Sequence, residues 1–361
     1  MKPDVSIIMS VYNGELYLRE AIESILHQTM QNWELIVIND CSTDSTAEIL
    51  AEFAEREERI KVHPNEVNLR LPTSLNKAIS LASGRYIARM DADDISLPTR
   101  LEQQVRFMDA HPDVDLSSCR FMTMKNGVYA SGGAGGRCDD GALRAMLLVA
   151  NPILHPGVIA KADVMKAFPY DKNHTCTEDL ELWTRMAMAG KTLAILPECL
   201  LLYRLHDKQI TSTTLERQRT EVLTVQDKYY AAFAEVMDAE TKNFYIDGVY
   251  FRTKAEIKPF LTYAKWLRNV TKQTLPKNAV NYALLEVLAE YKRHGVKKAD
   301  VIKAMLTFPP CFLMRELRRR KRAANTDIAK CRAVAEGLGL RQTSGSEEYP
   351  IYESESQVAS K

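Results

Sequence analysis

The sequence predicts an α/β fold, with a mostly parallel central sheet flanked by helices and a mainly helical region toward the C-terminus. In the first half, short apolar runs such as residues 5–11 and 35–38 are typical of strands buried on both faces of a sheet. Between these runs, apolar residues recur every three to four positions, which is the spacing of one helix face. Alternation of the two patterns predicts parallel strands joined by helices.

The individual elements follow from the same patterns, taken in chain order. The apolar runs predict strands at residues 5–11, 35–38, 60–62, 86–90 and 193–202. The periodic segments predict helices whose buried faces carry Leu18, Ile22, Ile25 and Leu26, then Ile49, Leu50 and Phe53, then Leu75, Ile79 and Ala82, and then Leu101, Val105 and Met108. Gly84 is placed as a helix stop, Pro98 fits a first helical turn, and residues 177–190 read as a capped helix that ends at Gly190.

The pattern changes along the chain and suggests three parts. Residues 113–160 are less regular and include a glycine-rich stretch at 132–136, which we interpret as a loop or hairpin tip. Strand patterns end near residue 212, and helical patterns continue to about residue 335. We therefore expect an α/β domain over residues 1–212, a helical region over 213–340 and a polar, disordered tail over 341–361.

Composition excludes several classes of protein. The formal net charge is +1, which argues against a nucleic-acid-binding protein because such proteins need a strong basic excess. Seven cysteines without a CxxC pair indicate neither a disulfide framework nor a zinc site and favour a reducing cytoplasm. No signal peptide is evident, and no apolar stretch is long enough to span a bilayer.

Acidic residues follow two of the predicted strands. Asp40 comes after the strand at 35–38, and Asp91, Asp93 and Asp94 come after the strand at 86–90. Ligands of open α/β sheets bind beyond the carboxyl ends of the strands. Clustered carboxylates are costly unless a cation joins them, and Mg²⁺ is commonly bound by one or two carboxylates and substrate phosphates. The cluster suggests a metal that holds a diphosphate, whereas the alternative is a solvated turn with helix-capping aspartates.

Several motifs in a fixed order make the specific case. Over residues 3–210 the sequence resembles the family 2 glycosyltransferases, in segments that include VSIIMSVYNGELYLREAIESILHQT, ELIVINDCSTDST, GRYIARMDADDISLPTRLEQQ, NPILHPGVI, TEDLELWTRMAMAG and LLYRLHD. The resemblance implies the GT-A nucleotide-sugar-binding fold and an inverting enzyme that uses a divalent metal, Mg²⁺ or Mn²⁺. It also implies a nucleotide-sugar donor, such as a UDP-sugar.

The resemblance assigns expected roles to residues at the sheet edge. Val11, Tyr12 and Asn13 would contact the nucleotide base, and Asp40 would receive a base N–H. Asp91 would lie near the ribose. The metal would be coordinated by Asp93 and joined by His206, for which a surface histidine is the alternative. Relatives often carry glycine where this chain has Arg70, so Arg70 either contacts the diphosphate or points into solvent.

The acceptor side rests on the Glu178-Asp179 pair. By resemblance, Asp179 is the general base that removes a proton from the acceptor hydroxyl, and Glu178 orients that hydroxyl. Trp183 would stack on an acceptor sugar or belong to the core. The helix N-terminus should lower the pKa of Asp179 and burial should raise it, so the sequence leaves the direction open. His155 belongs to the matched NPILHP segment without an assigned role.

The expected acceptor is a saccharide or a lipid-linked saccharide, as in capsule or O-antigen synthesis. An apolar patch at residues 306–314 precedes the basic cluster at 315–322 and either packs normally or binds the inner face of a cell membrane. Two other classes share some features. A GT-A-like nucleotidyltransferase should have a glycine-rich basic loop after the first strand, which this chain lacks, and a non-catalytic glycan-binding protein would not need both acidic motifs.

Overall fold

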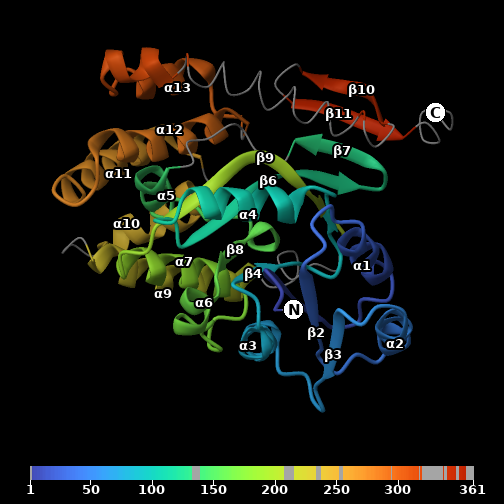
Figure 1. The fold of residues 1–361 in the computed structure, drawn as a ribbon. Helices are drawn as coiled ribbons and strands as arrows, with labels where there is room; N and C mark the ends of the chain where they lie inside the picture. Colours follow the sequence, from blue (N-terminus) through green and yellow to red (C-terminus); the bar gives the residue numbers. More distant parts are fainter. Residues whose placement is uncertain are drawn as a thin grey trace.

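We describe the protein from a computed structural model (Figure 1). The structure describes residues 2–131, 139–206, 215–232, 237–251, 255–293, 295–316, 318, 336, 340–346 and 349–354. The glycine-rich stretch at 132–136 and the domain boundary predicted near residue 212 lie outside the described residues. Residues 317 and 319–322 of the basic cluster also lie outside them.

The central sheet is mixed and is parallel around its first strand. Four strands run parallel in the order β4-β1-β2-β3: β1 (Val5–Val11), β2 (Trp33–Asn39), β3 (Ile60–Pro64) and β4 (Tyr86–Arg89). Beyond β4 the sheet continues with antiparallel pairs through β8 (Ile159–Lys161), β6 (Leu116–Lys125) and β7 (Val128–Ser131). β9 (Leu193–Arg204) runs parallel to β6, and the short β5 (Ile95–Ser96) pairs with β9.

Helices cover both faces of the parallel strands, which explains why these strands read as continuous apolar runs. Ile7 and Val37 belong to one core with residues of α1 (Leu18–Leu26), α2 (Thr46–Arg56) and α4 (Arg100–Ala110). Ile8 and Ile36 belong to the opposite core with residues of α3 (Leu71–Leu81), α5 (Asp140–Met146), α6 (Ala162–Ala167) and α7 (Glu178–Met188). The predicted strands and helices of residues 1–112 are confirmed, with ends that differ by a few residues.

The helical region packs against the core that contains Ile8. It contains α9 (Leu215–Ala231), α10 (Ala239–Phe244), a π-helical turn (Tyr245–Tyr250), α11 (Ile257–Val270), α12 (Lys277–Arg293) and α13 (Lys298–Met305). Its buried residues Tyr230, Phe260 and Leu284 belong to the same cluster as Ile8 of the sheet. Figure 1 shows these helices beside α5 and α7, so they extend one continuous apolar core. Among the described helices, none has both the length and the hydropathy needed to cross a bilayer.

The tail contains two strands where the sequence suggested disorder. β10 (Leu340–Ser346) and β11 (Tyr349–Ser354) pair antiparallel, and β11 pairs with β7. The reason is backbone pairing: without β11, the outer N–H and C=O groups of β7 would form an open sheet edge. Such pairing depends little on side-chain composition, so the polar sequence did not reveal it.

Two local predictions needed correction. Gly84 does not end a helix, because α3 ends at Leu81 and is capped by Ala82. A Cβ atom at Gly84 would lie 2.6 Å from the backbone nitrogen of Ser6, so this glycine serves the close approach of two segments. Pro98 precedes α4 instead of lying in its first turn, and Thr99 is the N-cap.

Candidate active site

The predicted nucleotide-binding residues lie at one edge of the sheet. β1 is flanked by β2 and β4, with Val11 paired to Asn39 and Ile8 paired to Arg89. Asp40 and Asp91 therefore follow the strands on either side of β1, while Tyr12 follows β1 itself. This is the carboxyl edge at which open α/β sheets bind ligands, and Tyr12 is exposed there.

Asp40 is buried and held by the loop that precedes α3. Its Oδ1 accepts hydrogen bonds from Asn65 Nδ2 and from the backbone N–H of Leu69, each at 2.8 Å. Lys77 Nζ lies 2.7 Å from Asn65 Oδ1, which fixes the orientation of the amide that donates to Asp40. These bonds join Asp40 to this loop, and α2 is capped at Ser45, so Asp40 is not the cap that the sequence left as an alternative.

The loops after β1 and β2 are fastened to each other through Asn13. Its Oδ1 accepts a hydrogen bond from the N–H of Thr43 at 2.8 Å, and its own N–H donates to Ser42 Oγ at 3.0 Å. Asn13 has a φ of 53°, a left-handed conformation that asparagine tolerates better than most residues. Arg70 also has a positive φ, 69°, and is exposed at the N-cap of α3, on the same loop that holds Asp40.

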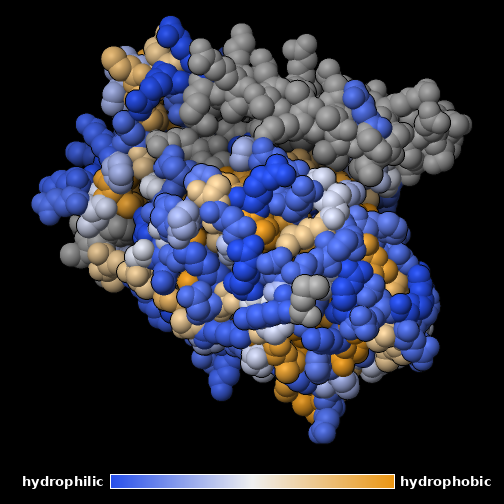
Figure 2. Space-filling view, in the orientation of Figure 1, coloured by the Kyte–Doolittle hydropathy of each residue, from blue (hydrophilic) through white to orange (hydrophobic). Residues whose placement is uncertain are grey.

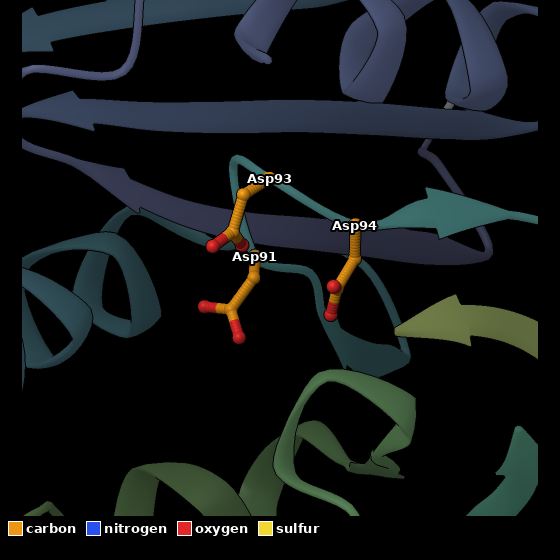
Figure 3. A group of neighbouring side chains, drawn as sticks. All are labelled: Asp91, Asp93 and Asp94. Carbon is orange, nitrogen blue, oxygen red and sulfur yellow. The ribbon is translucent and has the colours of Figure 1, made fainter. Parts of the chain in front are cut away.

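The acidic cluster after β4 forms a compact group of ligand atoms. Asp91, Asp93 and Asp94 each offer a carboxylate oxygen within 4.8 Å of the others, and the side chains project to the same side of one loop (Figure 3). His206, which follows β9, places its Nε2 2.8 Å from Asp93 Oδ2. Carboxylate oxygens of this kind suit Mg²⁺ or Mn²⁺.

The electrostatics of the cluster also fit a cation. Asp94 is fully buried, and its Oδ2 has no hydrogen-bond partner among the described residues. Burial and the neighbouring charges of Asp91 and Asp93 raise the pKa of Asp94 well above its ordinary value. Burial also raises the pKa of Asp91 to about 6, although the Arg89 guanidinium, which forms an ion pair with Asp91, opposes this rise. Bound positive charge would relieve this repulsion.

Arg204 ties the acidic loop to the strand that leads to His206. Its backbone N–H donates to Asp94 Oδ1 at 2.9 Å, and its Nε donates to the carbonyl of Asp93 at 2.8 Å. The guanidinium lies over the ring of Tyr17 and contacts Glu20 of α1. Arg204 of β9 therefore holds the loop of Asp93, and its own guanidinium is held in turn by Glu20 of α1.

Asp179 lies at the start of α7 with two hydrogen-bond donors. Its Oδ2 accepts from Asn151 Nδ2 at 2.7 Å, and its Oδ1 accepts from the N–H of Leu180 at 2.7 Å. Asn151 Oδ1 accepts from the N–H of Ile153, so the amide nitrogen must face Asp179. Burial outweighs these hydrogen bonds and raises the pKa of Asp179, which answers the question that the sequence left open.

Glu178, which directly precedes Asp179, is buried and lies next to the buried His155. His155 Nδ1 lies 3.6 Å from Glu178 Oε1, and its Nε2 lies 2.7 Å from the hydroxyl of Tyr170. Burial lowers the pKa of His155 well below its usual range and raises that of Glu178 to about 8. Both groups are therefore largely uncharged at neutral pH. The structure thus places His155 against Glu178 and Tyr170, whereas the sequence suggested no partner for it.

Asp91 and Asp179 come from different elements but lie close enough for their charges to interact. Burial is the main cause of the raised pKa of Asp91, and the charge of Asp179 adds to it. Trp183 is different: it is fully buried and packs edge-on against His155 at 5.8 Å between ring centroids. The expectation that Trp183 stacks on an acceptor sugar is corrected, because the ring belongs to the core.

Three site residues escaped the sequence reasoning: Arg89, Asn151 and Arg204. Arg89 is buried within an otherwise apolar strand, and such a buried charge was itself a signal of a nearby acid. Asn151 and Arg204 lie in segments that carried the resemblance, yet neither residue type indicates its role without the contacts it makes.

The chain is similar to known glycosyltransferases. The family model described as Glycosyl transferase family 2 matches residues 6–134. An uncharacterized glycosyltransferase of Methanocaldococcus jannaschii is 31% identical over 253 residues, which cover 69% of this chain and 84% of that protein. The putative teichuronic acid biosynthesis glycosyltransferase TuaG of Bacillus subtilis is 32% identical over 218 residues, covering 58% of this chain and 83% of TuaG.

Solved structures share the fold. S. aureus TarS 1-349 in complex with UDP-GlcNAc superimposes with a TM-score of 0.54 at 19% identity, covering 81% of this chain and 89% of the TarS 1-349 chain. The mannosyltransferase PcManGT from Pyrobaculum calidifontis, in complex with GDP-Man and Mn²⁺, gives a TM-score of 0.51 at 19% identity, covering 85% and 87%. These similarities confirm the predicted GT-A fold.

Proposed function

The chain belongs to glycosyltransferase family 2 and is a glycosyltransferase, and from this premise we propose that it is an inverting, metal-dependent enzyme using a UDP-sugar. The proposal is supported by the cluster of Asp91, Asp93 and Asp94 beyond β4 and by the interaction between the charges of Asp91 and Asp179. A base on the acceptor side and a cation site on the donor side are the two groups that a direct displacement requires.

On the donor side, the chain's residues bind and orient the nucleotide. Asp40 Oδ1 is already engaged by two donors, which leaves Oδ2 to accept an N–H from the base. Tyr12 is exposed beside it, where its ring can contact the base, and Asp91 is placed for the ribose. Arg70, exposed on the loop that holds Asp40, is proposed to face the diphosphate.

Asp93 and His206 are the proposed metal ligands, and Asp94 supports them through its buried carboxylate. A divalent ion bound there would supply Lewis-acid charge at the leaving diphosphate. The role of Arg204 is to keep the loop of Asp93 in place before the donor arrives. This fixed loop lowers the reorganisation needed on binding.

On the acceptor side, Asp179 takes the proton from the attacking hydroxyl. Its raised pKa makes it a stronger base than an ordinary aspartate, and Asn151 fixes the carboxylate in one orientation. Glu178 retains its proton more readily and can therefore donate a hydrogen bond to the acceptor. Since the attack comes from the face opposite the leaving group, an α-linked donor would give a β-linked product.

We propose a saccharide or lipid-linked saccharide as the acceptor, in the synthesis of a surface polysaccharide such as capsule or O-antigen. The similarity to TuaG, which is named for teichuronic acid biosynthesis, supports this proposal. The test of the function uses thermal unfolding with a panel of UDP-, GDP- and dTDP-sugars, with and without Mn²⁺. One sugar nucleotide should stabilise the protein in a metal-dependent way and lose its sugar to a glycan acceptor. Absence of both effects across the panel would contradict the function.

A surface near α13 supports a peripheral contact with an anionic membrane. Ile302, Leu306 and Met314 are 47%, 75% and 55% exposed. Exposed basic residues lie near them in the sequence, namely Lys297, Lys298, Lys303, Arg315 and Arg318. In the described residues 297–316, the one acid that is not buried is Asp300, and it pairs with Lys303. Figure 2 shows apolar and hydrophilic residues side by side over α13, at the upper left. Apolar anchors within a basic surface match anionic headgroups.

Vesicle co-sedimentation tests this contact. The protein should sediment with phosphatidylcholine vesicles only when they contain phosphatidylglycerol. Leu306→Asn combined with Met314→Asn should weaken binding by about 100-fold or more, since each buried Leu or Met contributes about 1.5–3 kcal/mol. Met188→Asn, which changes an exposed methionine on α7, is the control. Equal binding to both vesicle types would remove the membrane from the proposal.

A further inference from the structure

α9 contacts the turn that leads into the Glu178-Asp179 pair. Glu221 of α9 is buried, and its Oε2 accepts from the N–H of Cys176 and from the hydroxyl of Thr177, each at 3.0 Å. Its Oε1 lies 3.4 Å from the N–H of Thr175 and 2.8 Å from Arg217 Nε. One side chain from the helical region therefore holds three consecutive residues before α7.

This contact replaces the usual cap of a helix. Thr177 is the N-cap of α7, but its side chain makes no capping bond within the helix. Its hydroxyl donates to Glu221 instead, and the carboxylate lies near the N-terminus of α7, where negative charge is favourable. These hydrogen bonds outweigh burial and lower the pKa of Glu221, so its charge is present at neutral pH.

The same helix also contacts the segment that leads to Asn151. Gln226 Nε2 donates to the carbonyl of Leu147 at 2.9 Å, and the Tyr230 hydroxyl donates to the carbonyl of Leu148 at 2.6 Å. The Tyr229 hydroxyl donates to the carbonyl of Arg144 at 3.1 Å. These carbonyls belong to the last turn of α5 and the residues after it, where backbone acceptors lack partners within the helix.

We propose that α9 is a brace that positions the general base, because it fastens both the turn before Asp179 and the segment before its partner Asn151. Asn151 and Asp179 are joined by a 2.7 Å hydrogen bond but come from separate segments, and α9 contacts the approach to each. The helical region thereby acts in catalysis without touching substrate, and Glu221 is a positioning residue. This inference rests on the proposed role of Asp179.

The test compares the removal of a carboxylate at two positions of α9. Glu221→Gln and Glu221→Ala remove the carboxylate that holds the turn, whereas Glu216→Gln removes an exposed carboxylate five positions earlier and is the control. We expect Glu221→Ala to lower kcat by about 10- to 100-fold, because small displacements of a catalytic group have costs of this order. Glu221→Gln, which keeps one acceptor oxygen, should lie between Glu221→Ala and the parent. Donor KM should stay within about twofold of the parent, because the contacts of Glu221 lie in the turn before Asp179.

Hydrogen exchange provides a readout that does not depend on turnover. The amide of Cys176 should exchange faster in Glu221→Ala and at the parent rate in Glu216→Gln. Unchanged kcat together with unchanged exchange in Glu221→Ala would overturn the brace, as would equal losses of kcat and donor affinity. If Glu221→Ala fails to fold, Glu221→Gln decides by the same measurements. Failure of the parent to transfer sugar would contradict the proposed function, whereas faster exchange at Cys176 would still support the contact.

Discussion

His206 Nε2 lies 2.8 Å from Asp93 Oδ2, although the two residues are 113 positions apart in the chain. β9 brings them together, since it runs beside β6 and ends at Arg204, two residues before His206. Arg204 then bonds to Asp93 and Asp94, which fixes the register between the two segments. A cation site built from both segments therefore depends on the packing of β9 beside β6.

Removing either proposed ligand should weaken metal binding without unfolding the protein. Asp93→Asn should abolish the stabilisation by Mn²⁺ in the presence of UDP, and His206→Ala should weaken the apparent Mn²⁺ affinity at least about tenfold. The measurement is a Mn²⁺ titration followed by thermal unfolding and by transfer rate. Asp113→Asn, an exposed acid outside the site, is the control. Parent-like Mn²⁺ affinity in both variants, or full activity after chelation, would contradict the metal site.

Removal of the proposed base should slow sugar transfer without weakening the binding of the sugar nucleotide. Asp179→Asn keeps the shape of the side chain but cannot accept a proton, so kcat should fall by about 10²- to 10⁴-fold. Binding of the sugar nucleotide, measured by calorimetry, should remain within about twofold. Transfer at the parent rate would show that another group is the base.

The rate should also depend on pH in a direction set by Asp179. Because burial raises its pKa above the ordinary aspartate value, the carboxylate becomes protonated at a higher pH than usual. A protonated Asp179 cannot remove a proton, so kcat/KM should fall as the pH is lowered, beginning above the range of an exposed aspartate. A pH profile that is flat from neutrality down to pH 4, with the fold intact, would argue against this assignment.

The sequence predicted the parallel half of the sheet well because both its signals are local. Runs such as Leu35 to Ile38 are apolar at every position since helices cover both faces, and the covering helices show the matching periodicity. β6 was missed because residues 116–125 mix serine, cysteine and threonine with apolar residues. Its strand character also depends on pairing with β8 and β9, whose residues lie far away in the sequence.

Candidate site residues could be predicted from the sequence where they belong to a recognisable motif. They could not be predicted where their position depends on how distant segments pack. Asp91, Asp93 and His206 belong to motifs, and the structure brings them to one place. Trp183 looked equally suited to a sugar or a core, and only its complete burial separates the two. Glu221 lies in a helix without a recognisable motif, so its contact with the turn before Asp179 could come only from the fold.

Glu34 provides a test of stability at the opposite edge of the sheet. Its carboxylate accepts from Ser6 and Ser83 and pairs with Lys61 at 2.6 Å; these bonds outweigh burial and lower its pKa from 4.5 to about 2. A pKa that is lower in the folded state stabilises the protein fully above about pH 4.5, and this stabilisation is lost as the pH falls toward 2. The gap corresponds to about 3 kcal/mol at neutral pH.

Glu34→Gln should therefore lower the free energy of unfolding by about 1–3 kcal/mol at pH 7, measured with urea. The difference from the parent should shrink to about half by pH 3, because Glu34 is then already protonated in the unfolded parent while it is still mostly ionised in the folded state. Glu55→Gln, an exposed acid on α2, should change the free energy by less than about 0.5 kcal/mol. A difference that stays constant with pH would show that the Glu34 charge does not contribute.

Alanine substitution at three glycines should have three different effects on stability, because each glycine has a different structural role. A Cβ at Gly84 would lie 2.6 Å from the Ser6 nitrogen, so Gly84→Ala should destabilise the protein by about 1–3 kcal/mol. Gly190 has open space but a φ of +77°, so Gly190→Ala should cost about 1 kcal/mol through backbone strain alone. Gly141 lies in α5 with only ordinary contacts, and Gly141→Ala should stabilise by about 0.5–1 kcal/mol. Urea unfolding of the three variants should preserve this order, and a neutral Gly84→Ala would mean that the two segments can separate without cost.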